Sequence, residues 1–170
     1  MSNYISSLTP LRAATFASGI STSVFFIGNL THSFFGAVPI IQSSGEITPA
    51  LDNKQKADLW LYFYERAKLV FVAAAATSTV SFATIAYLVR DETDRAIALV
   101  AAVASGAIVP WTVSQMLPVN DQLTAVSRGD RTKEAYVGPL VEKWRKAHNV
   151  RLLFGGIGYL AALTLAITAA

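Results

Sequence analysis

The stretch Leu69–Val89, LVFVAAAATSTVSFATIAYLV, decides the fold class, because it contains no charged side chain. A helix needs about 20 apolar residues to cross a hydrocarbon core of about 30 Å. Similar stretches cover Ala96–Leu117 and Leu152–Ala170, and a longer, more polar one covers Ala13–Ile41. Alternation with a period of two residues is absent, which argues against a β-barrel. We therefore predict an all-α, four-helix transmembrane bundle in a single domain, 1–170, with spans at about 13–41, 68–89, 96–117 and 150–169.

The composition of the chain agrees with a membrane protein. Hydrophobic residues make up 53% of it and charged residues 15%, whereas about a quarter of the residues in soluble domains are charged. The chain has no cysteine, which excludes disulfides, thiolate metal ligands and a cysteine nucleophile. Its net charge of +3 is not gathered into a basic run, so no nucleic-acid partner is expected.

The segments between the spans predict the topology. Only RDETD separates the second and third spans, whereas longer segments follow the first and third spans. An even number of spans places both longer loops on one face. That face carries eleven of the 14 basic residues: Lys54, Lys56, Arg66, Lys68, Arg128, Arg131, Lys133, Lys143, Arg145, Lys146 and Arg151. The opposite face has Arg12, Arg90 and Arg95, so the positive-inside rule predicts that the longer loops are cytosolic.

Polar and aromatic residues gather near the ends of the spans that meet these loops. Ser18, Thr22, Asn29 and Ser33 recur at helical spacing in the first span, with His32 beside them. Polar groups in a bilayer are costly and usually face the interior of a bundle. A hydrogen-bonded seam between helices explains this stripe without any function, but an imidazole so deep in the bundle requires a specific partner.

The other three spans bring further candidates to the same depth. The second begins with DLWLYFYERAK, where Tyr64 and Arg66 lie one turn inward of an aromatic belt. The third ends in PWTVSQMLPVNDQL, residues 110–123, where Trp111, Gln115 and Pro118 share a face. Asn120 follows this break, either as a helix-end residue or, as we favour, as the rim of a site.

The fourth span completes this set with a single stripe. Trp144, His148 and Arg151 fall at positions i, i+4 and i+7. Interfacial anchoring is the simpler explanation for each residue alone. Together, the candidates from the four helices predict a cup in the membrane that opens toward the cytosolic face and admits a flat, lipophilic molecule. Small residues on the helix faces favour close packing and permit a homo-oligomer.

Several of these segments resemble the anthrone oxygenase-like family of small four-helix membrane proteins, which is common in fungal polyketide pathways. WLYFYERAK and LVEKWRKAHNVRLL carry part of the resemblance, the second as Trp144, His148 and Arg151. The family pattern Pro-x-Thr followed by Met-x-Pro-x-Asn-x-x-Leu is present as Pro110, Thr112, Met116, Pro118, Asn120 and Leu123. The resemblance implies a multi-pass protein of the endoplasmic reticulum or another endomembrane, in contact with membrane lipid.

The resemblance also implies an activity, the oxidation of an anthrone-type aromatic polyketide to an anthraquinone by molecular oxygen. It implies no bound metal, flavin or haem. The predicted base is His148, with His32 as a second base or proton relay. Arg151 or Asn120 is expected to stabilise the oxyanion. The predicted substrate-binding residues are Trp144, Trp111, Asn29, Tyr64, Arg66 and Gln115.

Other functions remain open at the level of sequence. The two histidines with Asp121 or Glu142 could nominally form a two-His-one-carboxylate metal site, although no diagnostic ligand spacing is present. The same base and oxyanion pair could catalyse a cofactor-free cyclisation or isomerisation of a polyketide. A non-catalytic membrane scaffold is the alternative outside enzymes. Transport is disfavoured because neither an inverted repeat nor paired broken helices are visible.

Overall fold

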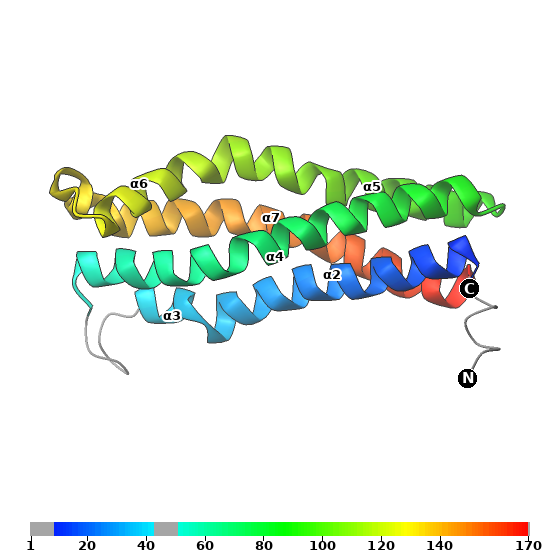
Figure 1. Cartoon of the computed structure of the whole chain (residues 1–170), viewed down its shortest axis with the longest axis horizontal. Helices are drawn as coiled ribbons and strands as arrows, with labels where there is room; N and C mark the ends of the chain where they lie inside the picture. The colour runs from blue at the N-terminus through cyan, green and yellow to red at the C-terminus, as the bar shows by residue number, and fades with distance from the viewer. Residues whose placement is uncertain (1–8, 43–50, 170) are drawn as a thin grey trace.

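The computed structural model describes residues 9–42 and 51–169, and the described residues contain helices and no strand. Figure 1 shows them as an elongated bundle. The elements are α2 (Pro10–Phe35), α3 (Ala37–Gln42), α4 (Asn53–Leu88), α5 (Glu92–Trp111), the π-helical turn η1 (Thr112–Met116), α6 (Leu117–Ser127), the 3₁₀ turn η2 (Arg131–Tyr136) and α7 (Val137–Thr168). The predicted all-α fold is confirmed.

Four helical stretches are long and apolar enough to cross a membrane. They cover Pro10–Gln42, Asn53–Leu88, Glu92–Ser127 and Arg131–Thr168, so each extends beyond the minimum length of a span. Large aliphatic side chains are exposed along all four, including Ile20, Val80, Val103 and Leu160. Such a surface is suited to lipid, and the chain is a multi-pass membrane protein.

Capping residues fix the starts of three of these helices. Thr9 accepts a hydrogen bond from the backbone of Arg12, and Pro10 occupies the first helical position, where a proline is favourable. Asp52 and Gln55 form a capping box at the start of α4. Asp91 accepts from two backbone amides at the start of α5. Because each cap satisfies amides with no partner inside the helix, the helix boundaries follow from local sequence.

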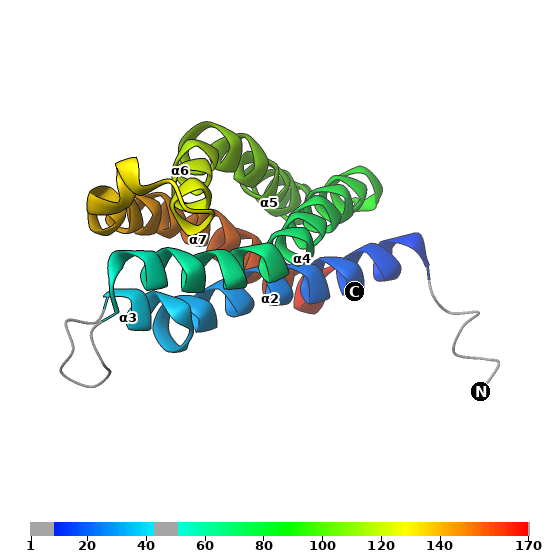
Figure 2. The same ribbon diagram turned by 60° about the vertical axis from the view of Figure 1, so that its left-hand side comes forward.

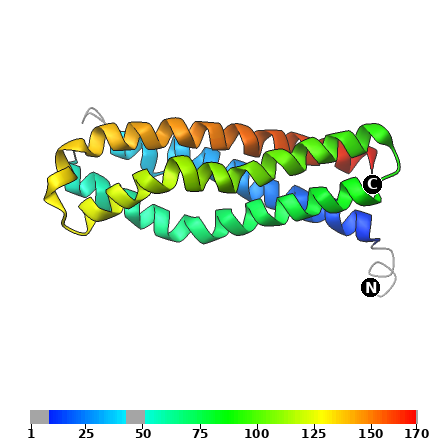
Figure 3. The same cartoon turned by 90° about the horizontal axis from the view of Figure 1, so that it is seen from above.

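The helices pack as an antiparallel bundle. α2 packs on α4 and α7, and α5 packs on the same two helices. Figures 1 and 2 show α2 running beside α4, and Figure 3 shows α7 beside α5 and α6. One end of the bundle, the turn end, holds the short α4–α5 connection, the start of α2 and the end of α7. The opposite end, the loop end, holds α3, the start of α4 and the α6–α7 connection.

The longer loops are largely helical in the described residues. The segment after the third span forms α6, η2 and the start of α7, and only Arg128–Asp130 lies between α6 and η2. Part of the other predicted loop, 43–50, lies outside the described residues. The loop end is therefore a folded extension of the bundle.

Two interruptions shape the helices near the loop end. The first is at Gly36, which separates α2 from α3. Pro39 lies in the first turn of α3, where its missing amide costs no helical hydrogen bond. The second is η1, where the amide of Leu117 bonds to the carbonyl of Thr112. This wider turn lets the helix continue past Pro118 into α6.

Candidate functional site

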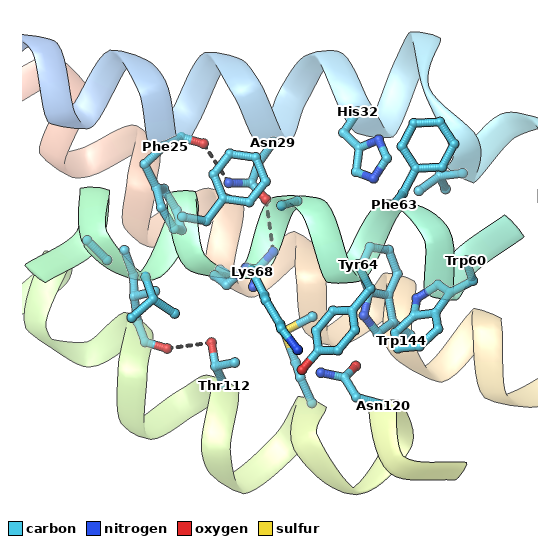
Figure 4. Close-up of a pocket in the computed structure, with 18 of the residues that line it drawn as sticks. Phe25, Asn29, His32, Trp60, Phe63, Tyr64, Lys68, Thr112, Asn120 and Trp144 are labelled. Carbon is cyan, nitrogen blue, oxygen red and sulfur yellow. Dashed lines mark hydrogen bonds between the residues drawn. The ribbon is translucent and has the colours of Figure 1, made fainter. Parts of the chain in front are cut away.

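A cavity lies between the helices in the half of the bundle nearer the loop end. It encloses about 930 Å³ of space between atoms, its opening included. Its aromatic lining residues are Phe25, Trp60, Phe63, Tyr64, Phe71 and Trp144. Its polar lining residues are Asn29, His32, Lys68, Thr112, Asn120 and Arg151. Figure 4 labels all of these side chains except Phe71 and Arg151 and shows how they surround the space.

A closed ring of hydrogen bonds supports one wall of the cavity. Arg151 Nη2 donates to Asn29 Oδ1 at 2.8 Å and to His148 Nδ1 at 3.0 Å. Ser33 Oγ lies 2.9 Å from His148 Nε2 and donates to the carbonyl of Asn29 at 2.9 Å. The ring therefore returns to Asn29, whose amide nitrogen also donates to the carbonyl of Phe25 at 2.6 Å. It ties α2 to α7 and fixes the position of the guanidinium.

The ring also determines the tautomer of His148. A guanidinium only donates hydrogen bonds, so Nδ1 of His148 accepts from Arg151 and carries no proton. The ring proton is then on Nε2 and is donated to Ser33 Oγ, whose own hydrogen is directed to Asn29. His148 is 1% exposed and stacks on Trp144 with ring centroids 4.7 Å apart. Both of its nitrogens are thus occupied by protein groups.

Arg151 carries a charge that no described carboxylate balances. The described residues form four ion pairs, and none of them includes Arg151. Its Nε is buried without a hydrogen-bond partner among the described residues. A cation in an apolar bundle is costly unless a partner group compensates it. Because Arg151 lines the cavity, the site is suited to a ligand that carries or develops negative charge on oxygen.

His32 offers the cavity an imidazole of a different kind. It is half-buried, lines the cavity and packs against the ring of Phe63 at 4.9 Å. Gly36 lies one turn after His32, and its lack of a side chain leaves room for the imidazole. A Cβ on Gly36 would lie 2.8 Å from the carbonyl oxygen of His32 and would also meet its Nδ1. The break after α2 and the orientation of His32 therefore depend on each other.

The aromatic side chains form the flat walls of the cavity at the loop end. Trp60 stacks on Tyr64 with centroids 4.8 Å apart and an interplanar angle of 14°. Trp60 also meets the edge of Trp144 at 6.5 Å. Trp60 and Trp144 are both buried, so their rings are held in place by packing. Flat, rigid walls of this type suit a planar aromatic ligand.

A second polar group of residues lies on the side formed by α4 and α6. Asn120 is 3% exposed, and its Oδ1 has no hydrogen-bond partner among the described residues. Figure 4 shows Asn120, Tyr64 and Lys68 with their polar ends directed toward the same part of the cavity. Lys68 also pairs with Glu65 at 2.6 Å. This side offers hydrogen bonds to polar substituents at the other end of a ligand.

The structure brings together six of the ten predicted site residues. Asn29, His32, Tyr64, Asn120, Trp144 and Arg151 line the cavity. His148 does not line the cavity itself but contacts two residues that do, Arg151 by a hydrogen bond and Trp144 by stacking.

The remaining three lie outside the cavity lining. Trp111 donates to the carbonyl of Ala147 at 2.9 Å, Gln115 is exposed, and Arg66 is exposed over the ring of Tyr62. Asn120 is a residue within α6, not at a helix exit, because the helix continues past Pro118.

The side chains of the nominal metal site do not converge. Asp121 is exposed, and Glu142 pairs with Arg145 at 2.7 Å. Neither carboxylate lines the cavity. Within 9–42 and 51–169, no group of three His, Asp or Glu side chains is placed to hold a metal ion. The histidine side of the cavity is bordered instead by a guanidinium, which repels cations.

Several residues of the site were not predicted from the sequence. Phe63 and Phe71 line the cavity but resemble ordinary apolar residues of a span. Thr112 and Met116 also line it, although the sequence named them only as members of the family pattern. Lys68 was predicted only as one of the basic residues of the loop face. Its spacing of four residues from Tyr64 could have identified it, because residues i and i+4 share a helix face.

The fold and site define a multi-pass membrane protein with an aromatic-lined cavity beside a buried polar ring. Within that class, the chain belongs to the anthrone oxygenase family, because the family model described as Anthrone oxygenase matches residues 60–161. The matched segment includes Asn120, Trp144, His148 and Arg151, whereas Asn29 and His32 precede it. No curated protein and no solved structure matches the chain.

Proposed function

We propose that this protein oxidises an anthrone-type aromatic polyketide to the corresponding anthraquinone with molecular oxygen and without a bound cofactor. One observation carries the proposal: the uncompensated guanidinium of Arg151 and the imidazole of His32 line the same aromatic cavity. Membership of the anthrone oxygenase family supports it.

The proposed reaction begins with removal of a proton. The methylene carbon of an anthrone is flanked by two aryl rings and conjugated through them to a carbonyl, so it is acidic for a carbon acid. A base takes one proton and leaves an aromatic enolate, whose negative oxygen is stabilised by Arg151. Because that negative charge is larger in the transition state than in the substrate, the interaction lowers the barrier.

Oxygen then reacts with the enolate. The enolate transfers one electron to O2, and the resulting radical and superoxide combine to form a carbon–oxygen bond. The peroxide anion formed in this way takes back the proton held by the base and becomes a hydroperoxide. Loss of the second methylene proton with cleavage of the O–O bond forms the new carbonyl. One oxygen atom enters the quinone and the other leaves as water. The protein supplies a base, an oxyanion partner and a dry, flat site.

The geometry favours His32 as the base that reaches the substrate. His32 lines the cavity, whereas the basic nitrogen of His148 accepts a hydrogen bond from Arg151. Imidazole titrates near neutral pH, which suits general base catalysis. His148 then serves as a positioning residue that holds Arg151 toward the enolate oxygen. The sequence-based prediction assigns the base to His148, and chemical rescue of the two alanine variants distinguishes these assignments.

The remaining lining residues have complementary roles in the proposal. Trp144, with Trp60 and Tyr64, holds the polycycle between flat walls, and Asn120 accepts a hydrogen bond from a phenolic hydroxyl through its unpaired Oδ1. The proposed orientation places the loop end in the cytosol, because it carries eleven of the 14 basic residues.

Oxygen uptake by membranes tests the proposed function. Membranes with the wild type and with Arg151→Met are incubated with an anthrone such as emodin anthrone, and oxygen consumption and quinone formation are followed. The expected result is quinone formation above the spontaneous rate, with one O2 consumed per quinone, and a loss of about 10²-fold or more in Arg151→Met. A wild type that does not exceed the spontaneous rate on several anthrones contradicts the proposal and points to cyclisation or isomerisation.

A further inference from the structure

The opening of the cavity is on the side of the bundle. Among the described residues that line it, three are exposed: Val72 at 54%, Val109 at 43% and Val113 at 56%. Val72 belongs to α4, and the other two flank the junction of α5 with η1. All three are apolar side chains within membrane-compatible stretches. The opening therefore faces the lipid.

The loop end of the bundle is closed by a packed core. Ala37, Val38 and Ile41 of α3 lie in one buried cluster with Trp60 and Trp144. Buried side chains of α6 and of the first turns of α7 continue the same cluster: Val119, Leu123, Val126, Val137, Leu140 and Val141. The cavity is thus separated from the loop end by close-packed side chains, and the cup predicted to open toward the cytosolic face has its opening elsewhere.

The π-helical turn η1 borders the lateral opening. α4 packs on α5, which precedes η1 in the chain, and on α6, which follows it, whereas η1 itself packs on α7. Pro110 and Pro118 lie on either side of this turn. Prolines and π-helical turns both bend helices. Figure 1 shows the α5–η1–α6 stretch bowed away from α4 where α5 passes through η1 into α6.

The opening lies at the level where apolar residues give way to charged ones. Lys68, one turn from Val72 on α4, lines the cavity and pairs with Glu65. Arg66 and Glu65 are exposed, whereas Leu69, Val70 and Val72 begin the exposed apolar surface of α4. This transition marks the boundary between headgroups and hydrocarbon. Planar aromatics with phenolic hydroxyls concentrate at that boundary, because one part is apolar and another requires water.

We infer that the substrate enters sideways from the lipid, through a window between α4 and η1 framed by Val72, Val109 and Val113. The ligand is an amphiphilic, planar aromatic molecule dissolved in the bilayer, and the inference rests on the proposed function for that substrate class. Its polar edge passes Lys68 and Thr112 and reaches Asn120 and Arg151 inside. The loop end is not an entry route.

Single-cysteine labelling tests the route, because the natural chain has no cysteine. Val113→Cys places a thiol at the window. Val103→Cys is the matched control on α5, since Val103 is 72% exposed and does not line the cavity. Gln42→Cys places a thiol on the exposed end of α3, at the loop end. Each variant is reconstituted in lipid vesicles and labelled with a bulky apolar maleimide or with the small N-methylmaleimide.

The rate of ligand entry is measured with a quinone, so that the result does not depend on turnover. Emodin is mixed with the vesicles, and the saturable quenching of tryptophan fluorescence is followed by stopped flow. We expect the bulky label at Val113→Cys to slow quenching about tenfold relative to the small label, and the label at Val103→Cys to change it less than about twofold. Unchanged quenching in labelled Val113→Cys, slowing from the label at Gln42→Cys, or no saturable quenching in the wild type overturns the inference. If quenching is saturable and the labelled variants show the expected pattern, but the wild type oxidises no anthrone, the result supports the route and contradicts the proposed function.

Discussion

The guanidinium of Arg151 donates to the side-chain oxygen of Asn29 at 2.8 Å, and this partner on α2 is an uncharged amide. An amide holds the guanidinium in place but leaves its positive charge unneutralised. A carboxylate at the same position would hold Arg151 equally well and cancel its charge. Exchanging this amide for a carboxylate would therefore change the ability of Arg151 to stabilise an oxyanion without changing its position.

Asn29→Asp tests this separation. We expect the variant to fold, because the new ion pair offsets the lost contact between the Asn29 amide and the carbonyl of Phe25. We expect kcat for quinone formation to fall by about 10²-fold, since the neutralised guanidinium no longer stabilises the enolate. Asn29→Leu is the control and should lower thermal stability as well, because it removes both bonds. Full activity in a folded Asn29→Asp protein contradicts the role of Arg151.

The two histidines are distinguished by chemical rescue. If His32 is the base, His32→Ala should lower kcat by about 10²–10⁴-fold, and added imidazole should restore part of the rate by entering the cavity. His148→Ala should also be impaired, because Arg151 loses an acceptor, but imidazole should not rescue it. His148→Asn should recover more activity than His148→Ala, since its amide oxygen can accept from Arg151. Rescue of His148→Ala alone assigns the base to His148.

Gly36→Ala tests the link between the helix break and His32. A Cβ at position 36 would lie 2.8 Å from the backbone oxygen of His32, and that atom cannot move without shifting α2. We expect a loss of stability of about 1–3 kcal/mol, together with lower activity because His32 is displaced. Gly138→Ala is the matched control, since a Cβ there meets nothing within 4 Å. Differential scanning fluorimetry in detergent and the quinone assay measure the two effects, and wild-type values for Gly36→Ala contradict the prediction.

The bundle and much of the site were predictable from regular helix geometry. Trp144, His148 and Arg151 share a face of α7 because no interruption separates them, so their spacing placed them together. Asn29 and His32 were predicted in the same way on α2. Spacing could not show which of the side chains on a shared helix face would reach the cavity. Trp144 and Arg151 line the cavity, while His148 is buried and does not line it.

The third span shows where regular geometry fails. Trp111, Gln115 and Pro118 share a face only if the helix is a continuous α-helix, but η1 adds a residue to this turn and rotates the residues after it. Met116 and Asn120 face inward as a result, and Gln115 is exposed. Pro118 was expected to end the helix because the prediction assumed regular α-helical geometry up to that residue. The two prolines indicate an interruption, but they do not reveal that a wider turn would absorb it.

Metal removal should leave the reaction unchanged. The carboxylates of the nominal metal site face away from the histidines, since Asp121 is exposed and Glu142 pairs with Arg145. We expect membranes treated with EDTA, and the variants Asp121→Ala and Glu142→Ala, to retain activity within about twofold of the wild type, as is typical of surface substitutions. A loss of activity in EDTA that added Fe²⁺ or Mn²⁺ restores contradicts the cofactor-free proposal and supports a metal oxidase.

The turn end of the bundle should affect stability and not catalysis. There Thr168 of α7 donates to the buried carboxylate of Asp94 on α5 at 2.6 Å, beside a separate apolar core. Thr168→Val keeps the shape of the side chain and removes this donor, which should destabilise the protein by about 1–3 kcal/mol, because the carboxylate loses a partner. Activity at temperatures below unfolding should remain at the wild-type level, because the cavity lies toward the loop end. A fall in kcat in the folded Thr168→Val protein would show that the site is coupled to the turn end through α5 or α7.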